Sequence, residues 1–146
     1  MAELSQSVKI EAPVQKVFAF VTNPANWTKF VTSLVDVSEL SPEMPQAGAT
    51  FAWEYKMLGL RFSGQGRVTE YEKDRSFAIS MSGRFPITET YHFMPRGQGT
   101  ELTVKIHYEV PEGIIGQIAD KVLLERLNAL EARNVLEKIK LLCEAL

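Results

Sequence analysis

The spacing of apolar residues changes along the first thirty positions of the chain. Residues 7–11 alternate polar and apolar side chains, which is typical of a half-buried strand. From Val14 to about Thr22 the apolar residues follow helical spacing, and a second short apolar cluster follows Asn23 and Pro24. The pattern predicts a strand and two short helices. Helices this short need a larger structure to pack against.

Prolines and an asparagine mark where these helices begin. Pro13 has the fixed φ that suits the first turn of a helix, and it follows the expected end of the strand at Ala12. The residue before a proline is disfavoured in the α conformation, so the first helix is expected to end before Pro24. Asn23 is a suitable N-cap for the second helix.

The middle of the chain alternates apolar and polar residues over a series of strands. The predicted strands are residues 33–40, 50–57, 60 to about 68, 76–82, 87–94 and 100–110. One apolar and one polar face, repeated along the chain, indicate an antiparallel sheet with one solvated side. Gly64 and Gly66 suggest a bulge or sharp curvature in the third of these strands.

Pro111 and Gly113 end the sheet, and a long helical pattern runs from about Ile114 to the C-terminus. The charges of this stretch balance, which favours a solvated outer face. A helix is only about 10 Å wide, so one helix cannot cover a long curved sheet. The rest of that face is therefore either sealed by loops and the short helices or left open as a cavity.

Composition narrows the class of protein. At 146 residues the chain is expected to form a single domain, residues 1–146. A net charge of −2 gives no electrostatic footprint for nucleic acid or anionic lipid. No apolar run approaches the roughly 20 residues of a membrane span, and the start lacks a signal-peptide pattern, so a cytoplasmic protein is expected.

Metal binding and nucleophilic catalysis find little support. If the last hairpin turns at Gly97 and Gln98, His92 pairs with Thr103 and His107 with Thr88, which places the imidazoles about 13 Å apart. Both histidines fall on the predicted polar face. The one cysteine, Cys143, lies on the apolar stripe of the long helix, where a buried and inert thiol is expected. We therefore expect no metal and no cofactor.

Glu89 is the most unusual polar residue of the sheet. The same hairpin register places it opposite Ile106, on the apolar face with Tyr91. A carboxylate there is costly unless it is paired, and its pKa would tend upward. Glu89 is therefore either exposed to water, turned outward by a bulge or placed at the mouth of the strand, or it is a polar anchor or acid/base group inside a cavity, with Arg67 as the partner to consider.

The ordered set of elements resembles a known family. The stretches that carry the likeness are SVKIEAPVQKVFAFVTNPANWTKF, GATFAWEYKMLG, TYHFMPRGQGTELTVKIHYEVPEG and GIIGQIADKVLLERLNALEARNVLEKIK. Together they resemble the START-like, or SRPBCC, superfamily, and within it the polyketide cyclase/dehydrase and lipid-transport group. The resemblance implies an α+β helix-grip fold, in which a curved antiparallel sheet of six to seven strands wraps around the long C-terminal helix and a hydrophobic cavity.

The resemblance also implies a class of ligand. Members of the superfamily bind lipids, sterols, polyketides, plant hormones or quinones, and the aromatase/cyclases act on what they bind. In those relatives a pocket arginine and tyrosines orient a polyketide, which directs attention here to Arg67, Tyr55, Tyr91 and Tyr108. The candidate cavity residues are Trp53, Tyr55, Phe62, Arg67, Phe77, Ile79, Met81, Glu89, Tyr91, Phe93, Val104, Ile106, Tyr108, Ile115, Ile118 and Val122.

Three functions follow as hypotheses. The leading one is binding or transport of a small hydrophobic ligand between the sheet and the C-terminal helix. The alternative is a polyketide aromatase/cyclase or dehydratase that uses polar groups in the same cavity. A protein-interaction module is the third, but it would need an apolar patch on the outer face of the sheet, and the strand patterns offer none.

Trp27 either fastens the second short helix to the sheet or lines the cavity entrance. The loops at residues 82–88 and 111–116 are candidates to border that entrance.

Overall fold

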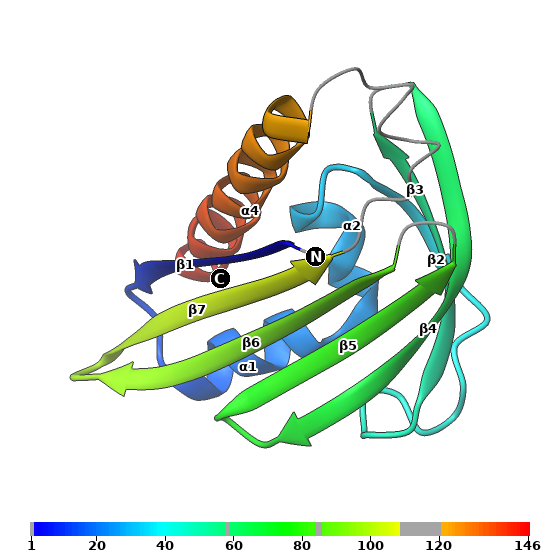
Figure 1. The fold of residues 1–146 in the computed structure, drawn as a ribbon. Coiled ribbons are helices and arrows are strands. Elements are labelled where there is room, and N and C mark those ends of the chain that lie inside the picture. Colours follow the sequence, from blue (N-terminus) through cyan, green and yellow to red (C-terminus); the bar gives the residue numbers. More distant parts are fainter. Residues whose placement is uncertain (1, 58, 84–85, 109–120) are drawn as a thin grey trace.

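The computed structural model describes residues 2–57, 59–83, 86–108 and 121–146. A seven-stranded antiparallel sheet, in the order β1-β7-β6-β5-β4-β3-β2, curves around the helices (Figure 1). The strands are β1 (Ala2–Ile10), β2 (Leu34–Ser38), β3 (Thr50–Met57), β4 (Leu60–Glu72), β5 (Ser76–Gly83), β6 (Ile87–Arg96) and β7 (Gly99–Tyr108). The helices are α1 (Val14–Thr22), α2 (Trp27–Phe30) and α4 (Lys121–Glu144), with a 3₁₀ turn, η1 (Pro24–Asn26), before α2. This is the predicted helix-grip architecture.

The short helices begin close to where the prolines predict. Pro13 has extended backbone angles and forms the N-cap of α1. It therefore lies directly before the helix, whereas the sequence predicted it at the first helical position. Asn23 caps η1, because its side-chain oxygen accepts a hydrogen bond from the Ala25 N–H at 3.1 Å. The first strand is longer than its alternation indicated, since β1 already begins at Ala2.

The hairpin of β6 and β7 has the predicted register. His92 pairs with Thr103 and His107 with Thr88, and Glu89 lies opposite Ile106. Side chains alternate between the faces of a strand, so this register decides which residues of β6 face the helices. Glu89 is buried with the apolar residues of that face.

The glycines of β4 make room for aromatic rings of β3. Gly66 lies directly opposite Phe51, and a Cβ atom at Gly66 would lie 2.3 Å from the Phe51 Cζ atom. Gly64 lies opposite Trp53 in the same way. The bulge expected at these glycines is not there: the register against β5 shifts directly after Val68 instead. Gly66 thus makes room for the Phe51 ring, whereas a Cβ atom at Gly64 would first meet the Ser82 carbonyl oxygen of β5.

Helix α4 lies along the free edge of β1, as Figure 1 shows. Arg133 donates a hydrogen bond to the Ser7 carbonyl at 3.2 Å, and Lys140 donates one to the Lys9 carbonyl at 3.0 Å. These bonds use carbonyl groups of an edge strand that would otherwise face solvent or another chain. Among the α4 residues whose side chains are described, the buried ones are Asn128, Ala132, Val135, Leu136, Ile139 and Cys143.

Candidate functional site

Two small cavities lie between the sheet and the helices. The first encloses about 20 Å³ between the sheet, including its edge strand β2, and the helices α1 and α2. The second encloses about 30 Å³ between the sheet and α4. Each cavity therefore has room for about one water molecule. Val31, Tyr55 and Glu89 line both cavities, so these side chains form the partition between them.

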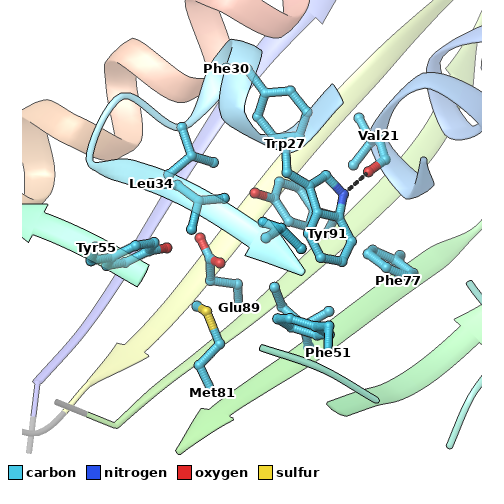
Figure 2. Close-up of a pocket in the computed structure, with 13 residues that line it drawn as sticks. Val21, Trp27, Phe30, Leu34, Phe51, Tyr55, Phe77, Met81, Glu89 and Tyr91 are labelled. Carbon is cyan, nitrogen blue, oxygen red and sulfur yellow. Dashed lines mark hydrogen bonds between the residues drawn. The ribbon is translucent and has the colours of Figure 1, made fainter. Parts of the chain in front are cut away.

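Glu89 supplies the carboxylate of this partition. Only 6% of its surface is exposed. Figure 2 shows its carboxylate turned into the first cavity, between Leu34 and Met81, with the Tyr55 hydroxyl pointing toward it. No side-chain hydrogen bond or ion pair from the described part of the chain reaches Glu89. The structure therefore resolves the two alternatives for Glu89 in favour of an inward-facing carboxyl.

Burial strongly perturbs the acids of the site. Loss of solvent raises the pKa of the Glu89 carboxyl to about 7, and the negative charge of Glu131 adds to the rise. Burial, followed by the charge of Glu89, also raises the pKa of Tyr55 and of Tyr91 well above that of a free phenol. At neutral pH Glu89 therefore titrates, and both tyrosines keep their protons.

Helix α4 contributes two polar side chains to the second cavity. Glu131 accepts a hydrogen bond from the Ser33 N–H at 3.1 Å, which ties α4 to the segment between α2 and β2. Asn128 is 9% exposed, and its Nδ2 donor has no partner among the described residues. With Glu89, the second cavity thus contains two carboxyl groups and an unpartnered amide donor.

Trp27 both fastens α2 and lines the first cavity. Its Nε1–H donates to the Val21 carbonyl at 2.8 Å, the bond drawn dashed in Figure 2. Its ring packs edge-on against Phe51, with centroids 5.1 Å apart, and lies tilted against Phe77. Trp27 therefore fastens α2, as the first interpretation has it, and lines the interior of the cavity, while its place at an entrance stays a prediction.

The structure brings some of the predicted cavity residues together and leaves others in the core. Those that line a cavity are Tyr55, Phe77, Ile79, Met81, Glu89, Tyr91 and Ile106. Those that are buried but line neither cavity are Trp53, Phe62, Phe93, Val104 and Tyr108. Ile115 and Ile118 fall outside the described residues, and Val122 belongs to α4 with its side chain outside the description.

The prediction that Arg67 faces the cavity is wrong. Arg67 is exposed, while its neighbours Gly66 and Val68 are buried on the opposite face of β4. Because side chains alternate along a strand, the even-numbered positions of this part of β4 point inward and Arg67 points to solvent. Glu89 therefore has no arginine partner from β4.

Sequence reasoning missed the residues that the helices contribute, together with several from the strands beside them. They are Val21, Phe30, Val31, Leu34, Val37, Phe51, Ile87, Asn128, Glu131, Ala132 and Val135. Glu131 is a charged residue of the long helix that lies away from its solvated outer face and is half-buried. Asn128, Glu131, Ala132 and Val135 are spaced along one helix face, but apolar spacing points only to Ala132 and Val135, because the other two residues are polar.

The remaining candidates for chemistry stay outside the site. His92 is exposed, and His107 is half-buried at 3.4 Å from Glu3. Cys143 is fully buried, and burial raises the pKa of its thiol to about 11. No group of three or more potential metal ligands occurs among the residues that the structure describes. None of the described helices is both long and apolar enough to cross a bilayer.

Comparison of the sequence with known protein families places the chain in one of them. The family described as "Polyketide cyclase / dehydrase and lipid transport" matches residues 1–144. The chain belongs to this family, as the resemblance predicted. No curated protein matches the sequence.

Solved structures share the fold at low sequence identity. The protein TTHA0849 of Thermus thermophilus is 17% identical, with a TM-score of 0.82 over 99% of this chain and 98% of that one. The Zhui aromatase/cyclase of Streptomyces sp. R1128 is 11% identical, with a TM-score of 0.76 over 98% and 93%. The di-domain aromatase/cyclase StfQ of the steffimycin pathway is 10% identical, with a TM-score of 0.79 over 98% and 51%. At such identities the likeness establishes the fold alone.

Proposed function

We propose that the protein binds a small, mostly apolar molecule in the space that the two cavities form when they are joined, with a polar group of that molecule at Glu89. Glu89 is the observation that carries the proposal. A carboxyl group in an apolar interior opposes folding unless it is paired, and the described residues offer Glu89 no partner. Ionisable groups kept in such surroundings are concentrated at functional sites. Membership of the family supports the same function.

Uptake of a ligand requires the partition to move. The two cavities are far smaller than the few hundred Å³ that organic ligands occupy. Val31, which directly follows α2, and Tyr55 separate them, and displacing these side chains would join both spaces around Glu89. β2 is an edge strand, paired only with β3, so the segment from α2 to β2 is the wall with the fewest sheet contacts to break.

Calorimetric titration with two probes, naphthol and decanol, tests this function. We expect at least one of them to bind the unaltered protein. Ala132→Leu should abolish that binding, because Ala132 is fully buried and its Cβ faces the second cavity. Ala19→Leu is the matched control, since Ala19 is exposed on α1 and lines neither cavity. Failure of both probes, or equal binding by both variants, contradicts the proposal.

A catalytic function is the second candidate, and the titration of Glu89 favours it. A carboxyl group with a pKa of about 7 is suited to accept and return a proton at neutral pH. In an aromatase/cyclase or dehydratase, such a group would remove a proton from the carbon beside a ketone. Deuterium exchange at that carbon of an aromatic diketone, with and without Glu89→Gln, tests this role. Exchange that is equal in both proteins contradicts it.

A further inference from the structure

The second cavity contains an unpartnered acceptor and an unpartnered donor. Glu89 is 6% exposed and accepts no hydrogen bond from a described side chain. Asn128, 9% exposed, presents Nδ2 without an acceptor. Both residues line the same cavity, from β6 and from α4. Nδ2 of Asn128 is a buried polar atom without a partner, which pays its full cost of desolvation, and the Glu89 carboxyl lies in the same apolar surroundings. Both groups are therefore strong determinants of what enters.

The charge of the two cavities is one-sided. Glu89 and Glu131 are the charged residues among those that line them, and no lysine, arginine or histidine of the described chain does so. Burial strengthens electrostatic interactions, so a carboxylate or phosphate placed here would be strongly repelled. The cavity therefore disfavours an anionic head group, such as that of a fatty acid.

We infer that the ligand presents a neutral hydroxyl group, phenolic or alcoholic, which donates to Glu89 and accepts from Asn128. A hydroxyl is both a donor and an acceptor, so it satisfies both residues at once. An ammonium group would satisfy the acids but leave the Asn128 amide unpartnered. An ether or a ketone would satisfy Asn128 but leave an ionised Glu89 without a donor, so the preference for a hydroxyl is greatest above pH 7, where Glu89 is charged. This inference rests on the proposed function and narrows its substrate class.

A series of probes with a shared apolar body tests the inference by calorimetry. The series is naphthol, methoxynaphthalene, naphthylmethylamine and naphthoate, each titrated into the full chain at neutral pH. We expect naphthol to bind at least about tenfold more tightly than each of the others, the difference that one hydrogen bond to a charged group makes. Naphthoate should bind most weakly.

Two variants assign the preference to the named residues. Glu89→Met preserves the bulk of the side chain without its carboxylate, and Asn128→Leu removes the amide. In Glu89→Met the preference for naphthol over methoxynaphthalene should disappear, while binding of methoxynaphthalene persists. In Asn128→Leu the preference for naphthol over the amine should fall. Glu70→Gln, an exposed position on β4, should leave the whole series unchanged.

The outcomes separate this inference from the function beneath it. Binding of methoxynaphthalene or naphthoate as tightly as naphthol overturns the hydroxyl assignment alone. The same holds if the preference for naphthol survives in Glu89→Met, or if the amine binds as tightly as naphthol. Binding of none of the four probes overturns the inference, and if decanol also fails to bind, the proposed function is overturned with it.

Discussion

Glu89 of β6 and Glu131 of α4 face the same cavity. Among the described residues, no positively charged side chain lines that cavity. Glu131 has a structural role because it accepts a hydrogen bond from the Ser33 N–H. Glu89 has no such role among the described residues. The negative charge of Glu131 disfavours ionisation of Glu89, so Glu89 is sensitive to pH in the neutral range.

The stability of the protein should fall as pH rises through the neutral range. The folded pKa of Glu89 is about 7, above its ordinary value of 4.5, so the folded state retains a proton that the unfolded state releases. Between these two values the free energy of unfolding therefore decreases with rising pH. A pKa unit corresponds to about 1.4 kcal/mol, so the loss attributable to Glu89 is about 3 kcal/mol.

Urea denaturation of Glu89→Gln at a series of pH values measures this loss. The variant should be close to the unaltered protein near pH 4.5 and more stable than it by about 3 kcal/mol above pH 7. Glu70→Gln controls for loss of a carboxylate, because Glu70 is exposed. A stability difference for Glu89→Gln that does not change with pH would contradict the placement of Glu89.

Removing the charge of Glu131 should lower the pKa of Glu89. Glu131→Gln retains an oxygen that accepts from the Ser33 N–H, so the fold should be preserved. Burial is the larger cause of the raised pKa, so the value should drop but stay above 4.5. An NMR titration that follows the Glu89 carboxyl carbon measures this directly. An unchanged pKa would show that the two acids do not interact.

The polar face and the register of the sheet could be predicted from sequence because alternation is a local property. The pairing of Glu89 with Ile106 followed from one turn position and the period of the strand. The same reasoning failed for Arg67, where the nearby glycines hid the alternation and the resemblance to aromatase/cyclases favoured an inward arginine. In the structure the inward positions at these glycines are filled by rings from β3.

The helical wall of the cavity could not be predicted in the same way. A helix face is assigned from apolar spacing, and Glu131 and Asn128 lie on the buried face of α4 without being apolar. Their burial depends on Ser33 and β6, which are distant in sequence. Val31 and Leu34 were likewise recognised as apolar, but only the packing of α2 against the sheet places them in the cavity.

The close packing of Phe51 on Gly66 should be measurable by stability. Gly66→Ala should destabilise the protein by about 1–3 kcal/mol, because the new Cβ would overlap the Phe51 ring. Combining it with Phe51→Leu should recover part of that loss, since the ring is then absent. Denaturation of both single variants and the double variant measures the coupling. Strictly additive effects would show that the ring does not occupy this space.

Arg67 should be dispensable for ligand binding. Its side chain is exposed on the outer face of β4, so Arg67→Ala should leave the affinity for naphthol unchanged. Tyr55→Phe is the informative comparison, because the Tyr55 hydroxyl points toward Glu89 in Figure 2. Weaker binding in Arg67→Ala than in Tyr55→Phe would restore the arginine to the site and contradict the orientation of β4.

A crystal structure of the protein grown with saturating naphthol would show whether Glu89 holds a ligand hydroxyl. We expect naphthol in the joined cavity, its rings against Trp27 and Tyr91, with Val31 and Tyr55 displaced. Its hydroxyl should lie about 2.7 Å from a Glu89 carboxylate oxygen. Naphthol seated only on the outer surface, with Val31, Tyr55 and Glu89 still dividing two cavities, would contradict the claim.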